Sequence, residues 1–498
     1  MIVQAPTIPI PVFVPAGITK WNTQPLSGSP NYAQIVSWTT DPGSASDSNG
    51  LKPNSASPGT VITASVSWSG SSVVNSAVTV RLLINNVVVA TGDTTTGKNT
   101  QVSSCTFTAD LQLSDVIKVQ VSYTGFAPTV NAGSGTYIRT SAPASTVEPE
   151  VNLPAPTGPY RIGAQDVFLT QTGRSDPFVP ANTRRISTTV WYPTTASFGR
   201  MARYLSEVSA TETTMATKDQ ATHASGGPAP AVMVGKVTHS FLNAPVRTDL
   251  GLLPVVMYSP GLNVGKEHGT AICEELASYG YVVISIACNY ESPATEFPDA
   301  LYFTDTRTET PAIRDMKLYA RIDDARYVMD KLTDPAVFGN GIAGLVDASK
   351  VGMMGHSNGG WTAIEVAAHD ARLKCCLDYD GQFTSSGQVN YAFNNGVDQP
   401  LMAFIEQGIT SADWSAFKSR IRGPLYQIEL AGSKHYAFTD LVSLADSSLS
   451  GTITPARAHI CCRAYTRAFF DKHLKGSAQV LLDGPSGTYP EVSFNTLG

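Results

Sequence analysis

The chain has 498 residues and a mass of 52.8 kDa, which is enough for roughly two to four domains. It carries 34 basic and 40 acidic residues, a formal charge of −6, and no basic run, so its composition argues against nucleic-acid binding. Charged residues make up only 15% and hydrophobic residues 42%, which excludes a globally disordered chain. The shortage of charge is balanced by Ser, Thr, Gly, Asn and Pro, which favours β-rich structure in part of the chain.

The seven cysteines form neither a CxxC pair nor a regular disulfide framework. We therefore expect buried free thiols, and no metal or other cofactor. No apolar run approaches the ~18 residues of a membrane-spanning helix. No Lys or Arg precedes Lys20, so the N-terminus does not resemble a secretory signal peptide. We expect a chain that is soluble and cytoplasmic as made; if it acts outside a cell, it leaves by another route.

The N-terminal part has its own texture. Residues 1–50 are rich in Pro, Gly and Ser, and we expect an extended arm that docks on a neighbour. Residues 51–141 contain short alternating runs with β-branched residues and regular turn signals, a pattern typical of a β-sandwich. Asn85-Asn86 has the composition of a two-residue hairpin turn. The proline-rich residues 142–159 are expected to be a stiff linker between domains.

From residue 160 to residue 498, strand-like and helix-like runs alternate, which predicts a mostly parallel, doubly wound sheet with helices on both faces. Residues 200–228 break the alternation and are expected to be a surface loop or part of a lid. The expected strands cover 253–259, 281–288, 350–355, 373–380, 400–407 and 425–432, and the expected helices about 267–279, 313–332, 358–369 and 456–474.

The strongest chemical signal is the only GxSxG sequence of the chain, Gly355-His356-Ser357-Asn358-Gly359. A buried strand pattern precedes it and a helix pattern follows it, so Ser357 lies at the apex of a strand–turn–helix, the nucleophile elbow. Glycines allow the strained turn, and the helix N-terminus favours developing negative charge. Ser357 is therefore the candidate nucleophile.

A serine hydroxyl needs a general base, and His435 is the best of the histidines. It follows the predicted strand 425–432, in a loop at the carboxyl edge of a parallel sheet, where such folds gather catalytic groups. His356 is adjacent to Ser357 in a sharp turn, where neighbouring side chains point apart. The other candidates considered, His369, His459 and His473, lie on predicted helices.

The third group must be a carboxylate that orients the imidazole. Asp380 ends the strand that follows the elbow helix, which makes it the first choice. Asp378 points to the same face of that strand but lies deeper, and Glu406 ends the next strand; both remain alternatives.

An acyl-transfer site also needs two backbone N–H groups for the oxyanion. Asn358, directly after the nucleophile, is one expected donor. Leu262, in the Pro-Gly loop after the strand 253–259, is the other.

Residues ~157–476 resemble the platelet-activating-factor acetylhydrolase group of α/β-hydrolases. The resemblance implies an α/β-hydrolase domain that hydrolyses carboxylic esters, often acyl groups on lipids, without a metal. It places the acid 23 residues after the serine, at Asp380. One departure concerns the pocket: Ala287-Cys288 stands where many members carry Asp-His. The matching stretches are Gly158-Pro159-Tyr160, Val190-Trp191-Tyr192-Pro193, Thr238-His239-Ser240, Ser259-Pro260-Gly261-Leu262, Glu296-Phe297-Pro298-Asp299, 321–326, Gly355-His356-Ser357 and 432–440.

The runs VTVRLLINNVVVATG and SGTYIRTSAPA resemble, more loosely, β-sandwich modules of minor tail proteins from phages of mycobacteria. That resemblance implies a virion tail location, action at the host cell exterior, tail proteins as partners and a homotrimer. The combined hypothesis is a serine esterase or lipase attached to a larger assembly. The alternatives are a host-adsorption protein whose hydrolase domain only binds, and an amidase or peptidase with the same triad.

Overall fold

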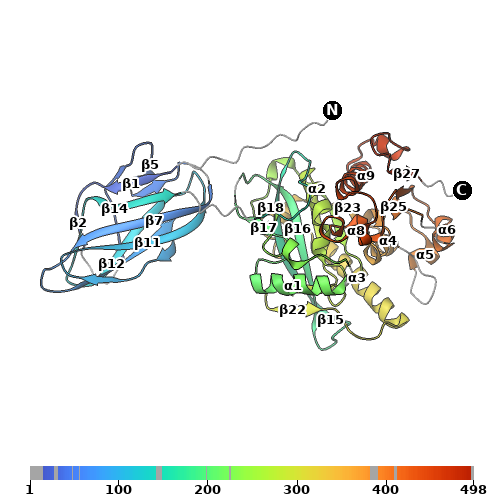
Figure 1. Cartoon of the computed structure of the whole chain (residues 1–498), viewed down its shortest axis with the longest axis horizontal. Coiled ribbons are helices and arrows are strands. Elements are labelled where there is room, and N and C mark those ends of the chain that lie inside the picture. Colours follow the sequence, from blue (N-terminus) through green and yellow to red (C-terminus); the bar gives the residue numbers. More distant parts are fainter. Residues whose placement is uncertain are drawn as a thin grey trace. The chain divides into compact units, whose positions relative to one another are not determined.

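The computed structural model describes residues 15–26, 32–47, 49–54, 57–141, 149–197, 199–223, 226–381, 391–408 and 412–494. The chain divides into two compact units (Figure 1). Unit 1 comprises Met1–Val147 and Ser197–Arg200, and unit 2 comprises Glu148–Ala196 and Met201–Gly498. In Figure 1 unit 1 is largely blue, and unit 2 runs from teal through green and yellow to red.

Unit 1 contains two antiparallel sheets around one apolar core. The first has the order β2-β13-β7-β14-β1-β4, and β11 also pairs with β7. The second has the order β10-β8-β12-β6-β5, and in it β3 pairs with β12 and β9 pairs with β8. The strands are β1 (Gly17–Lys20), β2 (Gln24–Pro25), β3 (Ala33–Gln34), β4 (Trp38–Thr40), β5 (Ala45–Asp47), β6 (Gly50–Lys52), β7 (Ser57–Ser69), β8 (Ser76–Ile84), β9 (Val87–Thr91), β10 (Thr95–Gly97), β11 (Thr100–Leu111), β12 (Ile117–Gly125), β13 (Thr129–Val130) and β14 (Gly133–Ser141).

The expectation of an extended arm over residues 1–50 is wrong for the described part of this segment, which contains short strands. β1 pairs with β14 and β4, and β3 pairs with β12, so this segment is part of the sheets. The buried side chains of Ile18 and Ile35 belong to the core of unit 1. Because these strands are two to four residues long, they show no alternation that the sequence could reveal. Residues 1–14 of the predicted arm lie outside the described residues.

Two local features of the N-terminal part can be compared with the sequence. Asn85 and Asn86 both have positive φ, 51° and 69°, between the paired strands β8 and β9, as a two-residue hairpin turn requires. The second half of the predicted linker belongs to unit 2: Val151 is buried there, and its N–H donates to Val237 O at 2.9 Å. The first half, residues 142–148, lies outside the described part of the chain.

Unit 2 is built on a sheet of order β17-β18-β15-β16-β20-β19-β23-β24-β25-β26-β27, in which β20 through β26 are parallel. A separate hairpin is formed by β21 (Ala294–Phe297) and β22 (Ala300–Phe303). The strands of the large sheet are β15 (Arg161–Ser175), β16 (Thr183–Thr194), β17 (Met201–Arg203), β18 (Val237–Leu242), β19 (Leu253–Ser259), β20 (Val282–Ile286), β23 (Val346–His356), β24 (Leu373–Tyr379), β25 (Leu401–Glu406), β26 (Leu425–Leu430) and β27 (Val492–Phe494).

Helices cover both faces of this sheet. Alternate residues of β19 enter different cores: Val255 and Met257 pack with the helices α3 and α4, whereas Val256 and Tyr258 pack with α2 and α9. The helices are α1 (Ser209–Thr222), α2 (Thr270–Ser278), α3 (Pro311–Lys331), α4 (Asn358–His369), α5 (Tyr391–Asn395), α6 (Ala412–Lys418), α7 (Leu441–Leu444), α8 (Ser447–Ser450) and α9 (Pro455–Lys475), with 3-10 turns η1 (Pro230–Val232), η2 (Thr248–Leu250), η3 (Lys266–Gly269), η4 (Ile342–Leu345), η5 (His435–Phe438) and η6 (Val480–Leu482).

Of the two expectations for residues 200–228, the surface loop is wrong, because they contain β17 and the 14-residue helix α1, whereas part of a lid stays a prediction. This helix has little apolar periodicity: Met215 and Ala216 are its buried apolar residues, beside the buried acids Glu212 and Asp219. Met215 and Ala216 pack in one cluster with Tyr204. Tertiary packing therefore stabilises α1, a helix that its own sequence pattern does not predict.

All seven cysteines are free and buried, as the sequence predicts. In the described part of the chain, no helix is both long enough and apolar enough to cross a membrane.

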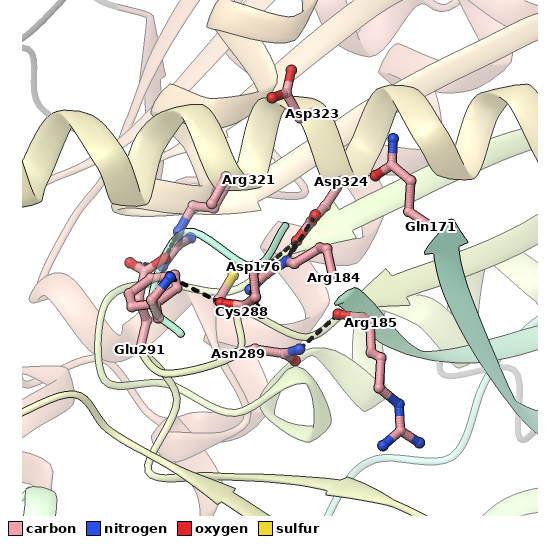
Figure 2. A network of polar contacts seen from close by, with 12 residues as sticks. Gln171, Asp176, Arg184, Arg185, Cys288, Asn289, Glu291, Arg321, Asp323 and Asp324 are labelled. Carbon is pink, nitrogen blue, oxygen red and sulfur yellow. Dashed lines mark hydrogen bonds and ion pairs between the residues drawn. The ribbon is translucent and has the colours of Figure 1, made fainter. Parts of the chain in front are cut away.

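A buried ion network fastens the β15–β16 hairpin to α3 (Figure 2). Arg184, on β16, bonds Asp324 Oδ2 through Nη2 at 2.6 Å and Asp176 Oδ2 through Nη1 at 3.0 Å. Arg174 adds a contact of 2.8 Å to Asp324 Oδ1. Because Arg184 and Asp324 are both almost inaccessible to solvent, removing one partner would leave a buried charge with only part of its compensation.

Replacing Asp324 by alanine should therefore lower the free energy of unfolding by about 3 kcal/mol, near the lower end for a broken buried pair because Asp176 still faces Arg184. Urea denaturation would measure the change. The control is Asp330→Ala on the same helix, which removes the exposed Arg372–Asp330 pair (2.7 Å) and should cost less than about 1 kcal/mol. Equal losses in the two variants would contradict the assignment.

Candidate active site

Ser357 occupies a sharp turn between β23 and α4. Its φ of 56° and ψ of −123° lie outside the regions that residues other than glycine normally adopt. Its N–H donates to Tyr379 O at 2.8 Å, which fixes the turn against β24. The glycines around it are required: a Cβ on Gly355 would lie 2.2 Å from the carbonyl carbon of Gly359, and one on Gly359 would lie 1.9 Å from Ser259 O. Close packing thus holds a half-buried serine at the end of a strand.

The structure brings His435 and Asp380 together. His435 begins η5, after β26, and Asp380 follows the last residue of β24 with a positive φ of 55°. The Nδ1 atom of His435 and the Oδ2 atom of Asp380 are 2.5 Å apart. The second carboxylate oxygen of Asp380 accepts the Glu406 N–H at 3.0 Å. The buried carboxylate therefore orients the ring and leaves Nε2 as its second functional nitrogen.

The other two carboxyl groups are placed differently. Glu406 contributes its backbone N–H to Asp380, and burial together with the Asp380 charge raises the pKa of its own carboxyl group. Asp378 is fully buried, accepts the Gly381 N–H at 2.9 Å, and has a pKa raised well above its usual value by burial. Among the described residues, Asp380 is the acid that bonds the His435 ring, whereas the Glu406 carboxyl group faces the His435 backbone N–H.

His356 links the serine turn to the histidine loop, a role that the sequence analysis did not foresee. Its Nε2 donates to the backbone carbonyl of His435 at 2.8 Å, and the two rings have centroids 4.5 Å apart. Burial lowers the pKa of His356 well below its usual value, so the ring is neutral and its Nδ1, which has no hydrogen-bond partner, carries no proton. Within the described residues, the Ser357 hydroxyl makes no hydrogen bond to the His435 ring.

The two predicted N–H donors lie beside Ser357. A Cβ on Gly261 would be 3.3 Å from Ser357 Cβ, so the loop after β19 that carries Leu262 lies against the serine. Asn358 is the first residue of α4. Within the described part of the chain, the backbone N–H groups of Leu262 and Asn358 donate to no protein acceptor. Both residues are half-buried, so a ligand oxygen can reach them.

Among the described residues, no group of three or more His, Cys, Asp or Glu side chains is arranged to hold a metal ion. The polar groups that converge here are a hydroxyl, an imidazole, a carboxylate and free backbone N–H groups.

The chain is similar in sequence to acetylhydrolases and esterases. The family described as platelet-activating factor acetylhydrolase, isoform II, matches residues 145–475. The probable 1-alkyl-2-acetylglycerophosphocholine esterase of Arthroderma benhamiae is 24% identical over 270 residues, 49% of this chain and 66% of that protein. The platelet-activating factor acetylhydrolase of Cavia porcellus is 24% identical over 385 residues, 68% of this chain and 84% of that protein. The chain thus spans slightly less than two thirds of the fungal relative.

Among solved structures, a ferulic acid esterase from Streptomyces cinnamoneus is similar, with a TM-score of 0.59 and 28% sequence identity. The match covers 70% of this chain and 99% of that protein. Since the family match covers most of unit 2, the chain belongs to the platelet-activating factor acetylhydrolase, isoform II, family of ester hydrolases.

Proposed function

We propose that unit 2 is an α/β-hydrolase that cleaves carboxylic esters through the triad Ser357, His435 and Asp380. The observation that carries the proposal is the 2.5 Å contact between His435 Nδ1 and Asp380 Oδ2, made by residues 55 positions apart at the ends of two parallel strands. The positive φ of Ser357 at the end of the neighbouring strand β23 supports it, since strained turns of this kind are typical of nucleophile elbows.

In the proposed mechanism Ser357 Oγ attacks the ester carbonyl while His435 Nε2 takes the hydroxyl proton. Asp380 holds the required tautomer and stabilises the imidazolium ion that forms. The N–H groups of Leu262 and Asn358 bind the oxyanion. His435 then protonates the leaving alcohol, and water releases the acyl group by the reverse sequence. The serine–histidine hydrogen bond would form when substrate binds, because such bonds are often long in unliganded enzymes.

We propose lipid-like or cell-envelope esters as the substrate class. The support is the set of relatives, whose names describe esterases of an acetylated glycerophospholipid and of ferulic acid. Two other readings use the same residues: an amidase or peptidase, and an adsorption protein in which unit 2 only binds. A pure binder has no need of a strained serine turn or an oriented imidazole, which favours the enzyme.

We further propose that unit 1 attaches the enzyme to a larger assembly, such as a phage tail that acts at the host cell exterior, and that the chain is a homotrimer. The support is compositional: unit 1 has its own core and the texture of a β-sandwich module.

Replacing Ser357 by alanine should abolish hydrolysis of p-nitrophenyl acetate, with kcat reduced by at least about 10⁴-fold, because the nucleophile is lost. A fluorophosphonate probe should label the wild type and not the variant. The control is Ser349→Ala, which removes an exposed hydroxyl from the start of the same strand, β23, and should retain labelling. Equal esterase rates for wild type and Ser357→Ala would refute the nucleophile.

The identity of the acid can be tested with matched amides. Asp380→Asn should reduce kcat about 10⁴-fold because the ring loses the acceptor that sets its tautomer. Glu406→Gln should cost less than about tenfold, since Glu406 contributes its main-chain N–H, which the variant keeps. Steady-state kinetics would decide; a larger loss in Glu406→Gln than in Asp380→Asn would reassign the acid.

A homotrimer would have three times the mass of the single chain in solution. Multi-angle light scattering of the full chain should return three times the chain mass of 52.8 kDa. A monomer mass would exclude the homotrimer. Antibodies against unit 1 should decorate the tail in electron micrographs of virus particles, and decoration elsewhere would exclude a tail location.

A further inference from the structure

We propose that Arg321 is a positioning residue that orients the Leu262 N–H for the oxyanion by holding the carbonyl groups of the loop after β19. The proposal rests on the proposed function, because it takes Leu262 as an oxyanion donor. Arg321 is only 5% exposed and lies on α3, a helix distant in sequence from both β19 and α4. It touches no reacting atom, so its effect would pass through the loop.

Every N–H of the Arg321 guanidinium has an acceptor. On one side Nε and Nη2 each donate to Glu291, both at 2.9 Å, in a bidentate pair (Figure 2). On the other side Nη1 donates to Pro260 O at 2.6 Å and to Ser259 Oγ at 3.4 Å, and Nη2 donates to Gly261 O at 3.4 Å. A guanidinium has five N–H groups, and all of them are used.

The contact with Gly261 O bears directly on Leu262. Because a trans peptide is planar, the Leu262 N–H points in the direction opposite to the Gly261 carbonyl of the same peptide unit. A carbonyl held by buried Arg321 therefore fixes the N–H on the other side of the loop. Since a Cβ on Gly261 would lie 3.3 Å from Ser357 Cβ, this loop is packed directly on the serine. Rotation of this peptide would turn the donor away.

The Glu291 carboxylate neutralises the charge of the buried Arg321 guanidinium. An unpaired buried guanidinium is very costly, and the carboxylate compensates it while leaving the other edge free for carbonyls. A tight turn after β20 positions Glu291: its N–H donates to Cys288 O at 3.0 Å, and the preceding Tyr290 has a positive φ of 67°. Ser292, next in the turn, donates to Val264 O at 3.0 Å. The turn after β20 thus supports the loop after β19 from two points.

A lysine cannot replace this contact set. Its ammonium group has three donors on one atom, which cannot pair with Glu291 and reach both carbonyls in the same geometry. The chain also offers a matched control: Arg184 is equally buried, is paired with Asp324 on the same helix, and has hydrogen bonds to Asp324 and Asp176 rather than to the loop. Figure 2 shows both arginines in the same region.

The test compares Arg321→Lys with Arg184→Lys in the full chain. Both should lower Tm. Only Arg321→Lys should lower kcat for p-nitrophenyl acetate, by about 10²-fold with KM changed less than about threefold, as expected for a misplaced oxyanion donor. Equal kcat losses in the two variants, or a loss confined to KM, would overturn the proposal.

Hydrogen exchange gives a second readout that needs no activity. Arg321→Lys should speed exchange of the buried Val264 amide, which donates to Gly261 O at 3.4 Å in the same loop, at least tenfold relative to wild type, and Arg184→Lys should not. If Arg321→Lys fails to fold, Glu291→Gln should show the same exchange effect more weakly; unchanged exchange there would overturn the proposal. If Ser357→Ala is as active as wild type, the proposed function fails, yet the exchange result still decides whether Arg321 holds the loop.

Discussion

Parallel strand register is the constraint on which the site depends. β23 and β24 pair so that Gly355 lies opposite Asp378 and His356 opposite Tyr379, and the next positions are Ser357 and Asp380. Both of these residues leave the sheet with positive φ, so two adjacent strands end in turns at the same edge. The loop after β26 brings His435 to that edge. Because the carboxyl ends of the parallel strands all lie at this edge, the sheet itself brings together residues that are far apart in sequence.

The polar groups around this edge are held by one another. His356 bonds the His435 carbonyl, Glu406 bonds Asp380, and Arg321 bonds the loop after β19. Each contact uses a backbone N–H or C=O on at least one side, so the positions are set by the main chain as well as by rotamers. Burial strengthens these interactions, because water cannot compete for the same donors and acceptors.

The parallel sheet and the helices α2, α3, α4 and α9 could be predicted because strand-like and helix-like runs alternate along this part of the chain; the helix predicted over 358–369 coincides with α4. Asp380 could be proposed because it directly follows a predicted parallel strand, and the carboxyl edge of a parallel sheet is where such folds gather catalytic groups. The short strands before residue 50 and the helix α1 could not be predicted, because their stability comes from partners distant in sequence. Arg321 and His356 also escaped prediction as supporting residues, since only the fold shows that they reach the loops beside Ser357.

The most direct test of the account is a crystal structure of the protein after reaction with a phosphonate ester that mimics the tetrahedral intermediate. The account predicts phosphorus bonded to Ser357 Oγ, a phosphoryl oxygen within about 3 Å of the Leu262 and Asn358 nitrogens, and His435 Nε2 within hydrogen-bond distance of Ser357 Oγ. An adduct on another residue, or a phosphoryl oxygen pointing away from both nitrogens, would contradict it.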